Sequence, residues 1–318
     1  RRGDRTRRDD AALGRSVLET YLAADGIAAS AESLPNGLFR AVWPLPAEPK
    51  ISIVIPNKNR FRLISTCIDG LLEKTDYRNI EIIVVDNAST DATKDIARSW
   101  ADVYLEGGPE RSAQRNRGIE AAQTPWIVWL DSDMILPPRA IEVALDTAQR
   151  TGADGVALPE RTIGDGFWTA CRALERECYL DQPWLHNPRL LRRDFMRTDG
   201  EFHLAMSGPE DADLRLKMRR AGQRIELAPI IIDHDEGRLT LRDVFSKRYY
   251  YGRSIPAFAA EHDGAVGQQG RDVLTAYWAH RDDLARRPLH AVGMVGMRAM
   301  EAVGYALGAA SARRDHAR

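Results

Sequence analysis

The sequence has few cysteines and no long apolar run, and each of these absences excludes a class of protein. Among its 318 residues there are 3 cysteines, Cys67, Cys171 and Cys178, which are too few for a disulfide framework and lack the spacing of metal ligands. A reducing compartment fits this usage best. No apolar run reaches the ~18 residues that span a bilayer, and there is no secretory apolar region. We therefore expect a cytoplasmic protein.

Net charge is also nearly absent. The 45 Lys+Arg residues balance 46 Asp+Glu, for a formal net charge of −1, whereas general nucleic-acid binding needs a basic face. We therefore expect no nucleic-acid partner. The exception is the start of the chain, which we expect to be a disordered, solvated tail and which contains Arg1, Arg2, Arg5, Arg7, Arg8, Asp9 and Asp10. The chain begins with Arg rather than Met, as a piece of something longer would.

Phosphate-cradling glycine motifs are missing as well. Neither G-x-G-x-x-G nor G-x-x-x-x-G-K-[ST] occurs, so the dinucleotide-binding and P-loop classes lose their main support. Phosphate would instead be bound by a metal ion and by arginines. Arg111 and Arg115 follow a Gly107-Gly108 loop, and their spacing of four residues places them on one face of a helix. For Arg111, a solvated helix face is an equally good interpretation.

What the sequence does contain is an alternation of apolar strands and helices. We expect strands at 51–55, 80–85 and 126–130, helices at 60–74, 91–101 and 112–122, and one further strand between the last two helices. Near-continuous apolar strands suit a sheet that is covered on both faces. The pattern predicts a doubly wound α/β domain. A helix at 11–24 and an irregular, proline-rich segment at 34–49 precede it.

The second half is less regular. We expect a helix at 138–151, a strand at 155–158, helical character at 167–180, a helix from Glu210, strands at 224–227 and 230–233, and helices at 240–260, 271–286 and 289–310. In the last helix, Leu289, Val292, Met297 and Met300 recur at helical spacing. Core packing or a homodimer face is the first interpretation of this stripe. Peripheral membrane contact is the second, because the helix is short of basic residues.

Polar residues follow all three apolar strands, at the edge where open α/β sheets bind ligands. The clusters are Pro56-Asn57-Lys58-Asn59-Arg60, Asp86-Asn87-Ala88-Ser89 and Asp131-Ser132-Asp133. Each is also a good turn sequence, but their joint placement favours one shared site. Asp-x-Asp recurs later in the chain, so what singles out the first copy is its position directly after the strand WIVWL. Two carboxylates there suit a hard divalent cation, the alternative being a loop turn.

Two acids open a helix after Ser207-Gly208-Pro209, and one histidine follows a later strand. Glu210 and Asp211 would either compensate the helix dipole or present a carboxylate base to the site. His234 lies between two aspartates just past an apolar strand. A lone histidine is more often structural, but this position makes it a candidate third metal ligand.

Taken together, these motifs resemble the family-2 glycosyltransferases of the GT-A fold, over roughly residues 50–255. The resemblance is carried by ISIVIPNKNR, EIIVVDNASTD, RSAQRNRGIEAA, WLDSDM, MSGPEDADLRLKMRRAG and IDHDEG. It implies a mixed sheet flanked by helices, a nucleotide-diphosphate sugar donor, a divalent Mn²⁺ or Mg²⁺ ion and inversion at the anomeric carbon. We accordingly divide the chain into a lead-in at 1–49, a catalytic domain at 50–236 (nucleotide-sugar half 50–135, acceptor half 136–236) and a C-terminal helical region at 237–318.

By position in these motifs, the resemblance gives each candidate residue a role. The nucleotide-sugar pocket would be lined by Pro56, Asn57, Asn59, Asp86, Asn87, Arg111, Arg115, Asp131 and Ser132. The metal would be held mainly by Asp133, with Asp131 beside it and His234 approaching the metal or the diphosphate. Asp211, supported by Glu210, would be the catalytic base that takes the proton of the acceptor hydroxyl.

The resemblance also favours particular substrates. UDP-sugar is the first expectation from family frequency, with GDP and dTDP sugars open. Residues 16–50 loosely resemble the segment before the catalytic domain of some bacterial O-antigen and rhamnan-type transferases. This favours a saccharide or lipid-linked saccharide acceptor in cell-envelope polysaccharide synthesis, and a protein that is cytoplasmic or held at the cytoplasmic face of the membrane.

Processive members of the family carry Q-x-x-R-W and membrane spans, whereas residues 245–252 here read FSKRYYYG, which favours transfer of a single sugar. Lys247, Arg248 and the adjacent tyrosines could close over the diphosphate or acceptor, or simply form a basic amphipathic helix. Two other classes stay open. A sugar-1-phosphate nucleotidyltransferase would carry G-x-G-T-R-L where this chain has PNKNR. A non-catalytic sugar-nucleotide-binding protein would not need Glu210 and Asp211.

Overall fold

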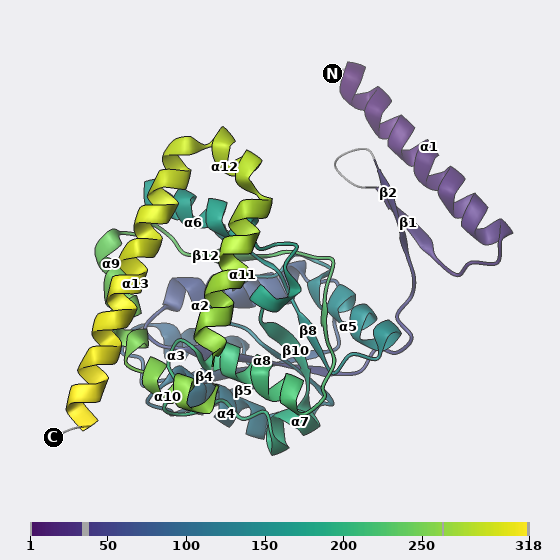
Figure 1. Ribbon diagram of the computed structural model, residues 1–318. Helices are drawn as coiled ribbons and strands as arrows, with labels where there is room; N and C mark the ends of the chain where they lie inside the picture. Colours follow the sequence, from purple (N-terminus) through teal and green to yellow (C-terminus); the bar gives the residue numbers. More distant parts are fainter. Residues whose placement is uncertain (1, 34–37, 263, 317–318) are drawn as a thin grey trace. The chain divides into compact units, whose positions relative to one another are not determined.

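The computed structural model describes residues 2–33, 38–262 and 264–316, and the chain divides into two units, Arg1–Glu48 and Pro49–Arg318. The first unit consists of a long helix, α1 (Arg2–Ala24), and an antiparallel hairpin of β1 (Ser30–Ser33) and β2 (Phe39–Val42) (Figure 1). Gly14 of α1 lies against the ring of Phe39, where a Cβ would clash. The helix and the hairpin therefore pack closely within this unit.

The first unit corrects two expectations. Helix α1 begins at Arg2, so the expectation of a disordered tail is wrong for the described part of that segment; arginine and alanine are good helix formers, and no proline interrupts them. The segment at 34–49, expected to be irregular, contains β2, which pairs along its length with β1. Arg1 and residues 34–37 lie outside the described residues.

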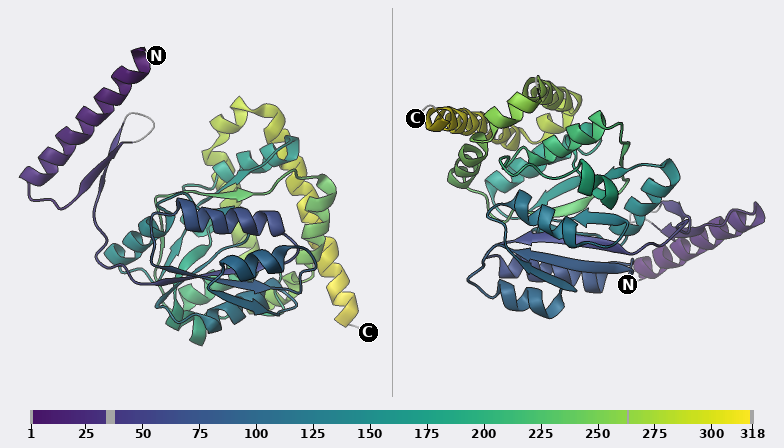
Figure 2. Two further views of the ribbon diagram at one scale, coloured as in Figure 1. Left: turned by 180° about the vertical axis from the view of Figure 1, so that it is seen from behind. Right: turned by 90° about the horizontal axis from the view of Figure 1, so that it is seen from below.

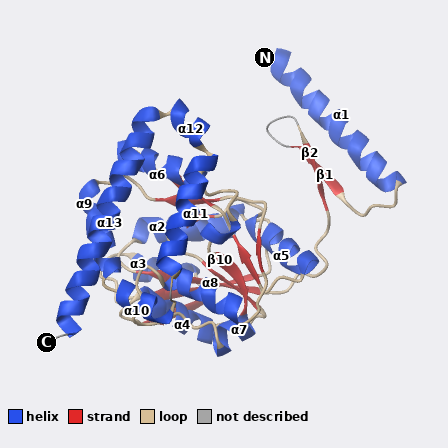
Figure 3. Cartoon of the chain, in the orientation of Figure 1, coloured by secondary structure: helices blue, strands red, loops and turns tan. Residues whose placement is uncertain are grey.

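The second unit is built on a seven-stranded sheet in the order β11-β8-β10-β6-β3-β4-β5. The strands of this sheet lie among the helices of the unit in Figure 3, where β10 is labelled. Its strands are β3 (Ile51–Asn57), β4 (Ile80–Asp86), β5 (Val103–Glu106), β6 (Trp126–Trp129), β8 (Gly155–Ala157), β10 (Pro188–Arg192) and β11 (Ile225–Leu227). Strands β3 to β6 run parallel, and β10 is antiparallel to both of its neighbours. A smaller sheet has the order β7-β12-β9 and consists of β7 (Met134–Ile135), β12 (Ile232–Asp235) and β9 (Glu160–Ile163).

Helices lie on both faces of the larger sheet (Figure 2). In the first half they are α2 (Phe61–Asp69), a π-helical turn (Gly70–Lys74), α3 (Thr93–Trp100), α4 (Arg111–Ala121) and α5 (Ala140–Thr151). The second half contains α6 (Phe167–Glu177), a 3-10 turn (Pro183–Leu185), α7 (Arg193–Thr198) and α8 (Glu210–Arg220). The C-terminal helices are α9 (Leu241–Gly252), α10 (Ile255–Glu261), α11 (Ala265–Ala279), α12 (Arg281–Arg286) and α13 (Pro288–His316). The sequence pattern did not indicate β9, β10 or α7.

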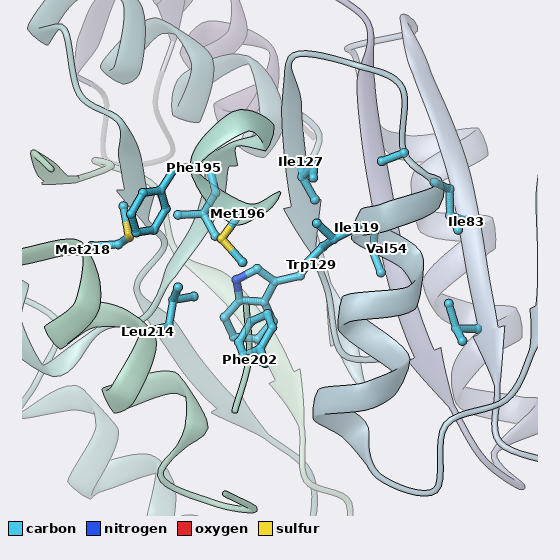
Figure 4. Packing of buried hydrophobic residues seen from close by; sticks show 13 residues of the cluster. Val54, Ile83, Ile119, Ile127, Trp129, Phe195, Met196, Phe202, Leu214 and Met218 are labelled. Atoms are coloured by element: carbon cyan, nitrogen blue, oxygen red, sulfur yellow. The ribbon is translucent and has the colours of Figure 1, made fainter. Parts of the chain in front are cut away.

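The core on one face of this sheet fixes α4 and α8 against the strands (Figure 4). Trp129 of β6 is fully buried and meets the ring of Phe202 edge to face, with 5.7 Å between the ring centroids. Its indole N–H donates to the carbonyl of Pro188 at 2.8 Å, which ties β6 to β10. Gly118 of α4 lies against Val54, where a Cβ would clash. The ends of these elements are therefore held in fixed relative positions.

Helix α13 packs along α9 and α6. Gly308 permits the close approach, because a Cβ there would lie 2.1 Å from the carbonyl oxygen of Tyr249. Met294 and Met297 are buried in this contact, whereas Leu289 and Val292 on the same helix are exposed. The apolar stripe of the last helix is thus partly core. None of the helices in the described ranges is long and apolar enough to cross a membrane.

Candidate active site

Several chain segments bring polar side chains to one edge of the seven-stranded sheet. Asn57 and Asp86 are paired at the ends of β3 and β4, and Asp131 follows the end of β6. Strand β10 runs the opposite way, so Asn187, just before its start, lies at this same edge. Helix α8 begins here with Glu210 and Asp211, and the Asn187 side chain donates to Asp211 Oδ2 at 3.1 Å. The edge therefore gathers carboxylates from segments far apart in the sequence.

The loops after β3 and β4 are held together by their own side chains. The Asp86 carboxylate is buried and accepts hydrogen bonds from the backbone N–H of Ser89, at 2.8 Å, and from its hydroxyl. Asn59, at a φ of 49°, donates its N–H to the Ser89 hydroxyl at 2.8 Å. The side-chain oxygen of Asn57 is buried and has no hydrogen-bond partner. These groups shape the loops, and their contact with a nucleotide stays a prediction.

Arg115 of α4 joins two carboxylates of the site. Its side chain is fully buried, and its guanidinium donates to Asp131 Oδ1 at 2.8 Å and to Asp211 Oδ1 at 2.7 Å. Burial works against the charge of Arg115, but Asp131 and Asp211 outweigh it and raise the pKa of the arginine. Burial likewise opposes ionisation of Asp131, yet Arg115, followed by Arg111 and Arg189, holds the pKa of Asp131 well below its usual value. The guanidinium is thus engaged by carboxylates, and its expected contact with a nucleotide stays a prediction.

Trp129 holds two arginines in place. The guanidinium carbons of Arg115 and Arg189 lie 3.9 Å and 4.0 Å from centroids of its ring system. Arg189 is nearly fully buried and also lies 3.8 Å from Asp131 and 2.5 Å from Glu160. Desolvated cation–π contacts of this kind contribute on the order of 2 kcal/mol each. The indole therefore fixes the planes of both guanidinium groups.

Glu210 supports the site from behind. It is almost fully buried and pairs with Arg111 at 2.7 Å, and Arg111 in turn donates to the Tyr251 hydroxyl at 3.1 Å. Burial raises the pKa of Glu210 above its usual value, although Arg111 opposes the shift. Because Tyr251 belongs to α9, this chain of contacts connects the start of α8 to the C-terminal helices.

Asp133 and His234 are suited to a metal ion. Asp133 Oδ1 is buried without a hydrogen-bond partner, and Oδ2 lies 3.5 Å from Nε2 of His234. Nδ1 of the same ring lies 3.3 Å from Glu160. Burial works against a charged ring, but Asp133 and Glu160 offset it and raise the pKa of His234 to about 9. Asp133 thus offers an unpaired carboxylate oxygen next to His234, and Glu160 binds the other nitrogen of the same ring. This arrangement fits a divalent cation.

Two adjoining hollows open among these residues. The smaller, of about 210 Å³, is lined by Asp131, Asn187 and Asp211. The larger, of about 660 Å³, is lined by Asn59, Ser132 and Asp133 and is more open. Residues that line both are His234, Glu236, Leu239, Asp243 and Lys247. A charged cavity therefore adjoins a wider groove, with His234 and α9 at their common boundary.

Residues 52–208 match the family described as Glycosyl transferase family 2. The chain therefore carries a family-2 glycosyltransferase domain. The chain is 30% identical over 245 residues to the O-antigen biosynthesis protein RfbC of Myxococcus xanthus, a match that covers 67% of this chain and 19% of that protein. It is 26% identical over 285 residues to the succinoglycan biosynthesis protein ExoA of Rhizobium meliloti (strain 1021), covering 83% of this chain and 86% of the relative. The chain thus spans about a fifth of the first relative.

The fold has a solved counterpart. The mannosyltransferase PcManGT from Pyrobaculum calidifontis, in complex with GDP-Man and Mn²⁺, superposes with a TM-score of 0.53 at 19% identity, and the match covers 84% of this chain and 81% of that one. The mixed sheet flanked by helices, followed by a C-terminal helical region, confirms the GT-A architecture that the motifs predicted.

The candidate residues of the site line one of the two hollows, lie behind them, or line neither hollow. The smaller hollow contains Arg111, Asp131, Asp211 and His234, and the larger contains Asn59, Ser132, Asp133 and His234. Arg115 and Glu210 lie behind the hollows and hold these side chains. The remaining candidates, which line neither hollow, are Pro56, Asn57, Asp86 and Asn87.

Sequence reasoning missed Glu160, Asn187 and Arg189 in this glycosyltransferase. Glu160 begins β9, Arg189 belongs to β10, and Asn187 directly precedes β10; the sequence pattern indicated neither of these short strands. A reader could have noticed the charged Arg189 immediately before the apolar pair Leu190-Leu191, a pattern typical of a strand that emerges at a polar edge. Lys247 and Arg248 of α9 line the smaller hollow, which favours a substrate-facing role over a simple amphipathic helix.

Proposed function

We propose that this chain is an inverting, metal-dependent glycosyltransferase that moves one sugar from a nucleotide-diphosphate sugar to an acceptor hydroxyl. A UDP-sugar is the first donor to test, followed by GDP and dTDP sugars. The acceptor is a saccharide or lipid-linked saccharide of cell-envelope polysaccharide synthesis. Support for these substrates comes from the relatives named for O-antigen and succinoglycan synthesis, and from the GDP-Man and Mn²⁺ bound by the mannosyltransferase of the same fold.

The observation that carries the proposal is the bridge from Asp131 through Arg115 to Asp211. Asp131 follows the strand that also leads to Asp133, the candidate metal ligand, whereas Asp211 begins α8 on the other side of the smaller hollow. One guanidinium thus holds a donor side and an acceptor side at a fixed separation. A displacement in which nucleophile and leaving group lie on opposite sides of the anomeric carbon requires such positioning.

Asp211 is placed to accept the proton of the acceptor hydroxyl. Arg115 and Asn187 each bind one of its carboxylate oxygens, which fixes its orientation while it stays accessible from the hollow. Attack from its side, opposite the nucleoside diphosphate, inverts the anomeric configuration. A divalent ion held by Asp133 with His234 would neutralise charge on the departing diphosphate. Lys247 and Arg248 bring further positive charge to the same hollow.

The test compares Asp211→Asn with the wild type and with Asp194→Asn, which changes an exposed aspartate in the first turn of α7. Asp211→Asn should lower the turnover number about 10²–10⁴-fold, the range for loss of a general base. Nucleotide-sugar binding with Mn²⁺, followed as a rise in melting temperature, should change little, because Asp211 lies on the acceptor side. Asp194→Asn should behave as wild type in both measurements.

The donor and the stereochemistry are tested on the wild type. UDP, GDP and dTDP sugars are compared by thermal shift with and without Mn²⁺ and with Mg²⁺, and NMR of the product reports the anomeric configuration. Full turnover by Asp211→Asn would remove that residue from its role. A retained configuration would remove inversion, and the absence of any metal-dependent shift would contradict the donor assignment.

A further inference from the structure

A third hollow of about 580 Å³ lies along α8, outside the site described above. We call it the α8 groove. Its lining includes Trp184 from the 3-10 turn, Arg215 and Arg219 from α8, Gln223 after that helix, and Gln268 and Asp272 from α11. It shares no lining residue with the two hollows at the sheet edge.

One face of α8 leads from Asp211 to this groove. Asp211, Arg215 and Arg219 follow one another at intervals of four residues, so they lie on one side of the helix. At a rise of 1.5 Å per residue, the eight residues from the first to the last span about 12 Å. Arg215 also comes within 3.5 Å of the side-chain oxygen of Asn187, whose amide donates to Asp211. The groove therefore begins next to the hydrogen-bond partner of the proposed base.

The side chains of the groove suit a sugar. Trp184 is 45% exposed, and a pyranose presents an apolar C–H face that packs on an exposed indole. Gln268 donates to Asp272 at 2.8 Å, which orients an amide and a carboxylate together. Among the described residues, no hydrogen-bond partner is found for the side chain of Gln223, so it is available for hydroxyl groups. An aromatic surface with a few directed polar groups is typical of binding sites for small, polar ligands.

The charges of the groove favour a sugar that carries no phosphate. Arg215 and Arg219 are balanced by Glu226 and Asp272. Glu226 also accepts a hydrogen bond from Arg224 at 2.7 Å, and Asp272 accepts one from Gln268, so both carboxylates are held in place. The larger hollow has Asp133 beside His234, a pair that suits a divalent cation for a diphosphate, whereas the described lining of the α8 groove contains no histidine. A second nucleotide is therefore a poor match to this groove.

We propose that the α8 groove binds the sugar units of an oligosaccharide acceptor that lie beyond the one receiving the new sugar. The inference rests on the proposed function, and it makes acceptor length the property that the groove recognises. An acceptor of one sugar reaches Asp211 but not Trp184. A longer acceptor fills both places, because its chain can follow α8 over the intervening distance.

The test compares Trp184→Ala with Trp278→Ala, in which a 73% exposed tryptophan of α11 outside the groove is removed. Acceptors are fragments of purified O-antigen and succinoglycan sorted by length, together with methyl glycosides of their component sugars. Trp184→Ala should raise KM about tenfold for the longer fragments and leave the methyl glycosides unchanged. Trp278→Ala should stay within about twofold for both classes.

Donor hydrolysis without acceptor separates failure of this inference from failure of the proposed function. It depends on the sheet-edge site alone and should be equal in all three proteins. Two outcomes with intact donor hydrolysis would show that the α8 groove does not bind the acceptor. In the first, Trp184→Ala changes no KM; in the second, it raises the KM of the methyl glycosides as much as that of the longer fragments. Intact hydrolysis with no transfer to any fragment would also overturn the inference. Absence of hydrolysis and of donor binding in the wild type would instead contradict the proposed function.

Discussion

Two buried networks of arginines and carboxylates in this molecule differ in how completely their polar atoms are paired. Around Arg115, atoms are left without hydrogen-bond partners, among them its own Nε and Nη1 of Arg189, which stacks on the same indole. The second network surrounds Glu301 of α13, which accepts hydrogen bonds from Arg172, Arg248 and Arg298. No side-chain atom of these four residues is among the unpaired buried atoms of the described part of the chain.

This difference in pairing indicates that the Arg115 network belongs to a binding site, whereas the Glu301 network mainly supports the fold. A buried polar atom without a partner costs about 1–3 kcal/mol, which a ligand can recover by binding it. The Arg115 network carries that cost at the edge of a hollow, as a binding site does. The Glu301 network also reaches the smaller hollow, which Glu301, Arg172 and Arg248 line, but its side chains leave no buried atom unpaired. It joins α13 to α6 and α9, the helix that carries Lys247 and Tyr251. We therefore expect changes in the first network to affect mainly activity and changes in the second to affect mainly stability.

The largest expected effect is that of Arg115→Lys on activity. A lysine keeps the charge but cannot bind two carboxylates in the planar geometry of guanidinium, nor stack in the same way on Trp129. We expect kcat to fall about 10³-fold, since electrostatic positioning of this kind contributes about 10²–10³ or more in rate. The melting temperature should also fall by several degrees, because the buried guanidinium loses ion pairs and its stacking. Turnover and thermal unfolding measure the two quantities. A large loss of stability with normal turnover of the folded fraction would reverse the assignment.

The next effect is that of Glu301→Gln on stability. The amide has the same shape as the carboxylate but leaves three arginines without their shared counter-charge. Removing one partner of a buried ion network costs about 3 kcal/mol, so the melting temperature should fall by several degrees. Turnover at a temperature where the variant is folded should fall by about tenfold at most, far less than in Arg115→Lys, because Arg172 and Arg248 keep their charges in the smaller hollow. A matched change outside the network is Glu226→Gln, which should leave the melting temperature unchanged.

The dependence of stability on acid pH gives a second test of Glu301. Burial opposes ionisation of Glu301, but Arg248, Arg172 and Arg298 outweigh it and lower its pKa to about 2. Because the pKa is lower in the folded state, the stabilisation is complete above the ordinary glutamate pKa and is lost as the pH falls toward about 2. Denaturant unfolding between those pH values should show that Glu301→Gln lacks part of the wild-type decline in unfolding free energy. Equal declines would remove Glu301 as a source of acid sensitivity.

The same contrast explains what the sequence could and could not predict. Asp131 and Asp211 were found because each stands at a local signal, the end of an apolar strand or the start of a helix. Their bridge through Arg115 was not, because a helical spacing of four residues cannot tell a buried guanidinium from a solvated one. Glu301 interrupts the apolar stripe of α13, and nothing near it in the sequence marks it as the centre of an ion network. Its partners come from α6 and α9, which only the tertiary fold brings together.

The strands also show which elements can be predicted from local sequence and which depend on the tertiary fold. Apolar runs predicted β3, β4 and β6, because each is buried on both faces and reads as a continuous β-branched or aromatic segment. Strand β10 has no such run, since it contains Pro188, Arg189 and Arg192, and it is held in place by β6 and β8 on either side. The residues that it brings to the site, Asn187 and Arg189, were missed for that reason.

The smallest expected effect concerns Tyr251, the residue that touches both networks. Its hydroxyl accepts a hydrogen bond from Arg111 at 3.1 Å, and the guanidinium carbon of Arg248 lies 5.9 Å from its ring centroid. Tyr251→Phe removes the hydrogen bond from Arg111 and keeps the contact of the ring with Arg248. It therefore tests the link to Arg111 without disturbing the link to the Glu301 network. Loss of one such hydrogen bond costs about 1 kcal/mol, which lowers kcat/KM about fivefold.

The control is Tyr249→Phe, on the same helix and in contact with Phe245 rather than with Arg111. It should leave kcat/KM and the melting temperature unchanged. If Tyr251→Phe lowers the melting temperature and spares kcat/KM, then Arg111 and Glu210 belong with the supporting network of Glu301. A loss confined to kcat/KM places them with Arg115, because the hydroxyl then acts through the arginine that lines the hollow beside Asp211.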